Sequence, residues 1–135
     1  MFIKEIKNYD VEAQEADIVV SDGKNSILCY AHPFKIKENI IFSLYAFGAK
    51  EIMKVNKNSY LIEKLDESYY AYHFRGKIID IKNKLTIILI NDIQLEMDDY
   101  IPNDLTINDF IEFSILRIDL LTNDEWCLDI IFLKD

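Results

Sequence analysis

Glycine, proline and cysteine are scarce in this sequence, whose 135 residues include 3 glycines, 2 prolines and 2 cysteines. The three glycines, Gly23, Gly48 and Gly76, lie too far apart for a Gly-rich phosphate-binding loop of the Walker or dinucleotide-binding kind. A G-x-S-x-G motif or comparable nucleophile motif is also missing. These absences predict a protein that is not an enzyme.

Long apolar runs are missing too. Residues 1–16 lack the uninterrupted apolar stretch of a signal peptide, and the longest run elsewhere, "LTIILI" at 85–90, is far too short to span a bilayer. We therefore expect a cytoplasmic protein with no membrane contact. In a reducing compartment, Cys29 and Cys127 are expected to be reduced core residues.

Basic residues are rare in the C-terminal part of the chain. Residues 1–84 carry 12 acidic and 13 basic side chains, whereas residues 85–135 carry 12 acidic and only 2 basic ones, within a net charge of -9. Such a field repels phosphate backbones and attracts cationic partners. The pattern favours a basic protein partner over nucleic acid, although acidity that only confers solubility is the alternative.

Isoleucine, tyrosine and phenylalanine are abundant, and 50% of the chain is hydrophobic, which favours strands and suits one domain spanning residues 1–135. Period-2 alternation bounded by turn residues marks the strands. The predicted strands are residues 2–7, 11–21, 26–32, 40–47, 52–55 or 60–65, 69–82, 85–97, 110–121 and 125–133.

Two segments resemble two others further along the chain. Residues 35–47, "KIKENIIFSLYAF", match residues 106–118, "TINDFIEFSILRI", and residues 17–28 line up with residues 77–88. This self-similarity predicts two similar β units in tandem, with residues 91–100 inserted in the second. The units cover about residues 11–66 and 69–135. A helix over residues 35–47, with Ile40, Leu44 and Phe47 on one stripe, is the alternative.

Two predicted strands change the parity of their apolar residues. The change falls at Gly76 in one and between Ile115 and Leu116 in the other, which indicates a bulge or a sharp bend. Long strands that bend suit an all-β fold, either a small antiparallel barrel or an orthogonal sandwich. The second half is similar in this rhythm to an OB-type barrel.

Cys29 and His32 lie three residues apart and raise the question of a shared site. A four-residue turn at 22–25 pairs Ile18 with Cys29 and places apolar residues opposite each other. Strand alternation then sends His32 to the opposite face from Cys29. The remaining candidates, His73 and Cys127, lack the close pairing of zinc ligands, so we expect no metal and no cofactor.

The acidic residues of the second half are the main candidate site. They predict a non-enzymatic, acidic protein-binding module, an inhibitor or immunity-type neutraliser of a basic protein such as a nuclease. Small acidic immunity proteins are similar in size and charge. The predicted interface residues are Asp92, Glu96, Asp98, Asp99, Asp104, Asp109, Asp119, Asp124 and Glu125.

An aromatic and basic segment offers an alternative function. An aromatic row of Tyr70, Tyr72 and Phe74 alternates with His73, Arg75 and Lys77, an arrangement that can stack bases and neutralise phosphates. Of these, Tyr70, Tyr72, Arg75 and Lys77 are the predicted ligand face of an OB-type binder of single-stranded nucleic acid or of a small ligand. The same alternation is also expected of a strand with one face in the core.

Overall fold

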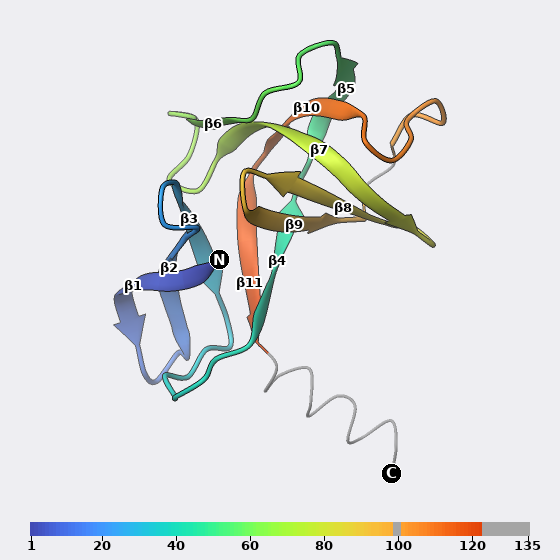
Figure 1. The fold of residues 1–135 in the computed structure, drawn as a ribbon. Helices are drawn as coiled ribbons and strands as arrows, with labels where there is room; N and C mark the ends of the chain where they lie inside the picture. The colour runs from blue at the N-terminus through green and yellow to red at the C-terminus, as the bar shows by residue number, and fades with distance from the viewer. Residues whose placement is uncertain (99–100, 123–135) are drawn as a thin grey trace.

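The computed structural model describes residues 1–98 and 101–122, which form eleven strands and no helix (Figure 1). The predicted all-β fold is confirmed, and the helical alternative for residues 35–47 is wrong because its second half is β4. The strands are β1 (Phe2–Asp10), β2 (Glu15–Ser21), β3 (Ser26–Ala31), β4 (Phe42–Phe47), β5 (Lys50–Val55), β6 (Leu61–Lys64), β7 (Tyr72–Lys82), β8 (Leu85–Ile90), β9 (Ile93–Met97), β10 (Phe110–Ile115) and β11 (Arg117–Thr122).

All eleven strands belong to one mixed sheet that is not closed into a barrel. The order is β1-β2-β3-β11-β4-β9-β8-β7-β10-β5. In addition to this order, β6 pairs with residues 72–75 of β7. Two neighbours are parallel: β3 with β11, and β4 with β9. The sheet is therefore not the antiparallel barrel that the sequence predicts, and an OB-like arrangement is not confirmed. Both parallel contacts join the first half of the chain to the second, which alternation within single strands cannot reveal.

Two long, bent segments of the chain each form two strands, residues 42–55 as β4 and β5 and residues 110–122 as β10 and β11. β4 pairs with β11 and β5 pairs with β10, and the bends fall at Gly48 and Leu116. The Leu116 N–H donates to the Phe47 carbonyl at 3.0 Å. Gly48 has a φ of +73°, and a Cβ there would lie 2.7 Å from Leu116 Cδ1, so only glycine fits. The predicted change of face after Ile115 is therefore a break between two strands.

The bulge that the sequence predicts at Gly76 lies elsewhere in β7. Gly76 sits in regular register opposite Ile111, and the register shift of β7 falls between Ile78 and Asp80. Gly76 is instead required by packing, because a Cβ would lie 2.7 Å from the side chain of Ile88. The expected single strand over 85–97 is a hairpin, β8–β9, so the predicted insertion at 91–100 contains a turn at 91–92 followed by β9.

The first hairpin agrees with its prediction. β2 pairs with β3 so that Ile18 faces Cys29 and Val20 faces Ile27 across a turn at 22–25. Cys29 is fully buried as expected, and His32 is exposed.

One hydrophobic core draws on both halves of the chain. Its largest buried side chains include Phe34 from the first half, and Phe74 and Phe113 from the second. β1 pairs with β2, so the first three-stranded meander begins before residue 11. The proposed duplication stays a prediction. Within the described residues, no helix has the length and apolar character needed to cross a membrane.

Candidate protein-binding face

Tyrosines and carboxylates alternate across four neighbouring strands. Tyr30 of β3 lies opposite Asp119 of β11, Asp119 lies opposite Tyr45 of β4, and Tyr45 lies opposite Glu96 of β9. Neighbouring strands are roughly 4.8 Å apart, so the four side chains form a short line. We call these four residues the tyrosine–carboxylate row.

Strand alternation explains why the row faces outward. The residues that flank Asp119, Ile118 and Leu120, are buried in the core, as are Leu44 and Ala46 on either side of Tyr45. Since successive side chains of a strand point to opposite faces, burial of these neighbours turns the row to the outside. Burial of the apolar neighbours therefore determines that the side chains of Asp119 and Tyr45 point outward.

Tyrosine hydroxyls hold carboxylates on this face. The Tyr30 hydroxyl donates to Glu15 Oε2 at 2.7 Å, and the Tyr45 hydroxyl donates to Asp98 Oδ1. The hydrogen bond to Glu15 raises the pKa of Tyr30, so this phenol stays protonated at neutral pH. A neutral hydroxyl orients a carboxylate without cancelling its charge. The face therefore keeps its negative potential.

Arg117 is the only Lys or Arg in strands β2, β3, β4, β9 and β11, which carry four Asp or Glu residues. Its guanidinium donates to both carboxylate oxygens of Asp119, at 2.5 and 3.2 Å. The same group lies over two rings, 5.2 Å from the centroid of Tyr30 and 4.8 Å from that of Phe47. This face thus already binds one guanidinium by ion pairing and by cation–π contact.

A groove opens at one end of the row, beside the contact of β4 with β9. Its volume is about 430 Å³. Two apolar side chains at this groove are unusually exposed, Ile41 at 63% and Leu121 at 42%. A smaller hollow of about 210 Å³ lies on the other side of β11 and shares Leu121. The residues that line the groove are Ile41, Phe42, Ser43, Tyr45, Glu96, Leu121 and Thr122.

The structure brings some of the predicted acidic residues together and separates others. Glu96, Asp98 and Asp119 lie on or beside the row. Asp109 caps a turn by accepting from the Thr106 N–H at 2.9 Å and pairs with Lys54, while the exposed Asp104 lies in the preceding loop.

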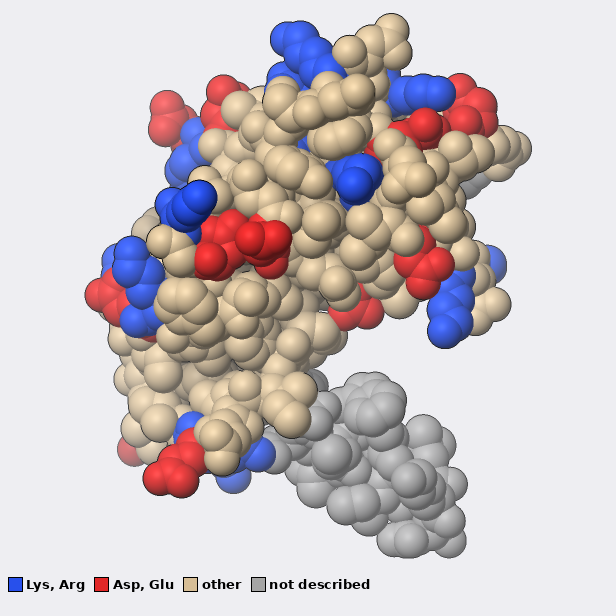
Figure 2. All heavy atoms as spheres, in the orientation of Figure 1, with Lys and Arg blue, Asp and Glu red and all other residues tan. Residues whose placement is uncertain are grey.

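The other predicted interface residues are elsewhere. Asp92 is in the β8–β9 turn, where its N–H donates to Asp22 Oδ2 at 3.2 Å. Asp99, Asp124 and Glu125 lie outside the described residues. On the side of the molecule drawn in Figure 2, acidic and basic side chains form small separate groups.

The residues of the alternative nucleic-acid face do not share one surface. Tyr72 is 6% exposed, and its hydroxyl oxygen accepts the Leu28 N–H at 2.9 Å. The side chains of Arg75 and Lys77 lie on the same face of β7, which is opposite to the face of its buried residues. The Tyr70 hydroxyl donates to Asp17. The core interpretation of this segment therefore fits the placement of Tyr72.

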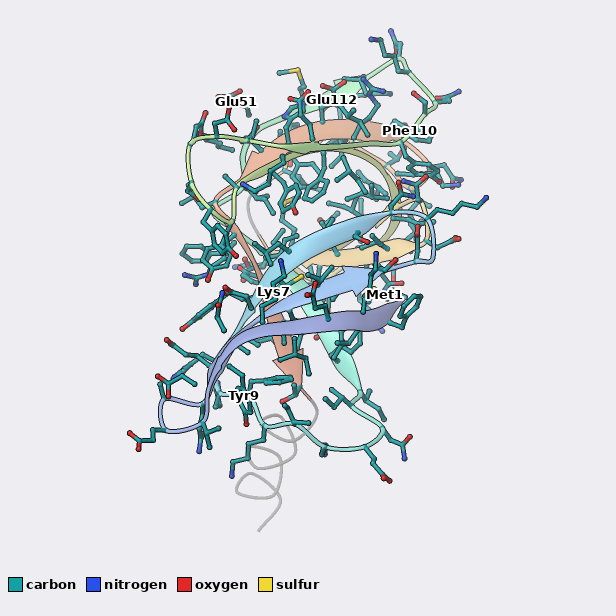
Figure 3. The ribbon with its side chains drawn as sticks, turned by 90° about the vertical axis from the view of Figure 1, so that its left-hand side faces the viewer. Met1, Lys7, Tyr9, Glu51, Phe110 and Glu112 are labelled. Carbon is teal, nitrogen blue, oxygen red and sulfur yellow. The ribbon has the colours of Figure 1, made fainter. Side chains whose placement is uncertain are left out.

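A second polar cluster lies on the outer side of β7 and β10. His73 bonds Ser114 Oγ through Nδ1 and Glu112 Oε1 through Nε2, both at 2.9 Å, and Arg75 Nε donates to Glu112 Oε2 at 2.9 Å. We call these four residues the histidine cluster. The bond from His73, followed by that from Arg75, lowers the pKa of Glu112. Figure 3 shows Glu112 at the end of the molecule opposite β1.

Ser, His and Glu also make up some hydrolase active sites, but this cluster lacks what such a site needs. Ser114 is only 6% exposed. Its strand is paired on both sides, with β5 and with β7, so the backbone N–H groups there are engaged in the sheet and cannot form an oxyanion hole. The cluster is best explained as a bridge between strands. Among the described residues no group of three or more His, Cys, Asp or Glu can hold a metal ion.

Sequence reasoning missed Tyr30, Tyr45, Ile41 and Leu121. Their strand parity was readable, but which strands lie side by side was not, and the row exists only through the two parallel contacts. Comparison with protein-family models, curated proteins and solved structures found no match. We therefore infer the function of this chain from its own geometry.

Proposed function

We propose that this protein is a non-enzymatic, acidic module that binds a basic protein partner through the tyrosine–carboxylate row. The observation that carries the proposal is the alternation of Tyr30, Asp119, Tyr45 and Glu96 over four adjacent strands that contain a single cation, Arg117. Tyrosine and arginine are enriched at the energetic centres of protein interfaces. Carboxylates beside them steer a cationic surface into place.

An inhibitory role follows from the same chemistry. A basic cleft that binds phosphate groups would accept this face instead, because the carboxylates offer it the same charge as its substrate. The module would then neutralise the partner by occupying its substrate site. The free, buried thiol of Cys29 is compatible with action in a reducing compartment such as the cytoplasm.

The test compares two variants of equal charge. Glu96→Gln with Asp98→Asn removes the charge of Glu96 in the row and that of Asp98 beside it, and Glu51→Gln with Asp66→Asn neutralises two exposed residues outside it; each pair changes the net charge from -9 to -7. Partners captured by the immobilised parent at low salt are identified, purified and measured by binding kinetics across a salt series. We expect the first variant to lose affinity about tenfold or more and the control to keep it. Equal loss in both variants would contradict the proposal.

One observation favours a second function, binding of single-stranded nucleic acid or a small planar ligand. Tyr70 contacts Tyr30 and Tyr69 with ring centroids 5.8 and 5.0 Å apart, and His32 stacks on Tyr30 at 6.5 Å. Such rings can stack bases. Titration with labelled oligothymidine tests this alternative, and Tyr69→Ala should abolish any binding that depends on stacking.

A further inference from the structure

We infer that the groove beside the row takes an extended, basic and amphipathic segment of the partner, with an apolar side chain and a Lys or Arg two residues apart. This inference rests on the proposed function and names the element of the partner that docks. The groove is the one lined by Ile41, Leu121 and Glu96, where β9 crosses β4.

The apolar end of the groove supplies an anchor point. Ile41 and Leu121 are 63% and 42% exposed, although Ile41 directly precedes β4 and Leu121 lies within β11, two strands that contribute to the core. Exposed aliphatic residues around a hollow of about 430 Å³ are a feature of surfaces that become buried in a complex. One apolar side chain of a partner can fill this end.

The acidic end lies at a fixed distance from the anchor. Leu121 of β11 is opposite Ser43 of β4, and two residues away on both strands Asp119 is opposite Tyr45, whose other neighbour is Glu96 of β9. Two residues of strand span roughly 7 Å. An extended segment repeats its side chains on one face with the same spacing, so an apolar residue over the Leu121–Ser43 pair places a cation two residues away over Tyr45, between Asp119 and Glu96.

The charges select among possible occupants. No described residue makes a hydrogen bond or ion pair to the Glu96 carboxylate, and the groove lining contains no Lys or Arg. Residues 123–135 follow Thr122 and carry four acidic residues against one Lys, so their charge repels that of the groove. A basic partner segment is the complementary occupant.

The backbone also allows an extended guest. β4 is paired with β11 at six positions but with β9 only where Tyr45 meets Glu96. A strand that is paired along one side and crossed at one point on the other presents an edge, to which an extended peptide adds by main-chain hydrogen bonds.

NMR titration of the full chain with synthetic peptides tests the inference. The probe is a synthetic peptide with the repeat Ser-Leu-Ser-Lys, in which each Leu and the next Lys are two residues apart. Matched peptides replace Lys by Glu, or Leu by Ala. We expect the Leu/Lys peptide to bind about tenfold more tightly than either control and to shift the amides of residues 41–45, 96 and 119–121.

Variants localise the site. Leu121→Ser should weaken binding of the Leu/Lys peptide about tenfold, whereas Met53→Ser, which removes a 53% exposed side chain from β5, should leave it unchanged. Circular dichroism confirms that both variants are folded. If cationic peptides bind but shift only residues near Tyr30, the groove is overturned and the proposed function stands. If Lys and Glu peptides bind equally, both are overturned.

Two further outcomes would identify a different occupant. Trp126 is the only tryptophan, and a change of its emission in Leu121→Ser without peptide would show that residues 123–135 fill the groove. A dimer of the parent that Leu121→Ser dissociates, seen by gel filtration with light scattering, would show that a second copy fills it. Either result overturns the inference.

Discussion

The two outer faces of the sheet differ in their balance of acidic and basic residues. Strands β2, β3, β4, β9 and β11 carry four acidic residues and one basic residue, whereas β5, β6, β7 and β10 carry four acidic and six basic ones. On the first face carboxylates meet tyrosine hydroxyls; on the second, in the histidine cluster, Glu112 meets His73 and Arg75.

This difference separates a face whose charges are paired within the chain from a face that leaves a carboxylate unpaired. In the histidine cluster each charge is compensated within the chain, so a partner would have to break existing pairs. In the tyrosine–carboxylate row only Asp119 is paired with a cation, Arg117, and the Glu96 carboxylate has no hydrogen-bond or ion-pair partner among the described residues. The experiments below test this contrast, in order of decreasing expected effect on stability.

The largest effect concerns the core that both faces share. Gly76→Val puts a Cβ 2.8 Å from the Leu89 carbonyl oxygen and 2.7 Å from Ile88 and Ile90, which backbone and core cannot relieve. We expect a loss of about 3 kcal/mol or more in the free energy of unfolding. Gly23→Ala, with φ +101° but no atom within 4 Å, should cost only about 1 kcal/mol. Urea denaturation measures both, and similar losses would contradict the packing argument.

We expect the loss of Glu112 to lower the free energy of unfolding less than Gly76→Val does, but more than any substitution in the tyrosine–carboxylate row. Glu112→Ala leaves Arg75, whose side chain is 12% exposed, without its carboxylate partner, and it also frees His73. We expect a loss of roughly 2 kcal/mol, measured by urea denaturation at neutral pH. The conservative Glu112→Gln keeps part of the hydrogen bonding and should lose less. A loss within 0.5 kcal/mol, about the level of neutral surface substitutions, would show that the cluster is not a stabilising bridge.

The two faces should lose stability at opposite ends of the pH scale. The pKa of Glu112 is lowered from 4.5 by His73 and Arg75, so its contribution is present above pH 4.5 and is lost as pH falls below it. The pKa of Tyr30 is raised from 10.0, first by its bond to Glu15, so its contribution is present below pH 10.0 and is lost as pH rises above it.

Urea denaturation over a pH series measures this contrast. In Glu112→Gln the free energy of unfolding should depend less on pH in the acid range only, and in Tyr30→Phe it should depend less on pH in the alkaline range only. A variant that alters the opposite range would show that the two faces are coupled.

Single hydrogen bonds of the row should contribute little. Tyr45→Phe removes the hydroxyl that donates to Asp98 and leaves the ring in place. Because this bond is exposed, we expect a loss of at most about 1 kcal/mol by thermal or urea unfolding. Tyr72→Phe is the buried counterpart, since its oxygen accepts the Leu28 N–H, and it should cost more. The reverse order would contradict the view of the row as a surface feature.

The smallest effect on stability should accompany the clearest effect on binding. Glu96→Gln removes a carboxylate with no hydrogen-bond or ion-pair partner in the described part of the chain, so its free energy of unfolding should change by less than about 0.5 kcal/mol. Its affinity for the basic partner should fall severalfold, and the salt dependence of association should become shallower. Unchanged affinity with unchanged stability would remove Glu96 from the proposed interface.

Local features of the fold could be predicted because they depend on neighbours in sequence. The pairing of Ile18 with Cys29 followed from matching apolar residues across a four-residue turn. The bulge at Gly76 was misplaced because parity cannot distinguish a glycine that bends a strand from one that admits the side chains of Ile88 and Ile90.

The candidate site could be predicted only in part. Glu96, Asp98 and Asp119 were identified by the excess of acid in the second half of the chain. Their neighbours Tyr30 and Tyr45 come from the first half, and nothing in composition or alternation links them to those carboxylates.

Local patterns in the sequence are enough to specify an all-β protein with a buried Cys29 and an acidic second half, because period-2 alternation, turn chemistry and charge are local properties of the chain. That the sheet stays open, with β3 beside β11 and β4 beside β9, emerges only in the folded structure. Parallel contacts between distant strands depend on how the whole core packs, since side-chain alternation would be satisfied equally well beside many other partners. The tyrosine–carboxylate row is a product of that packing.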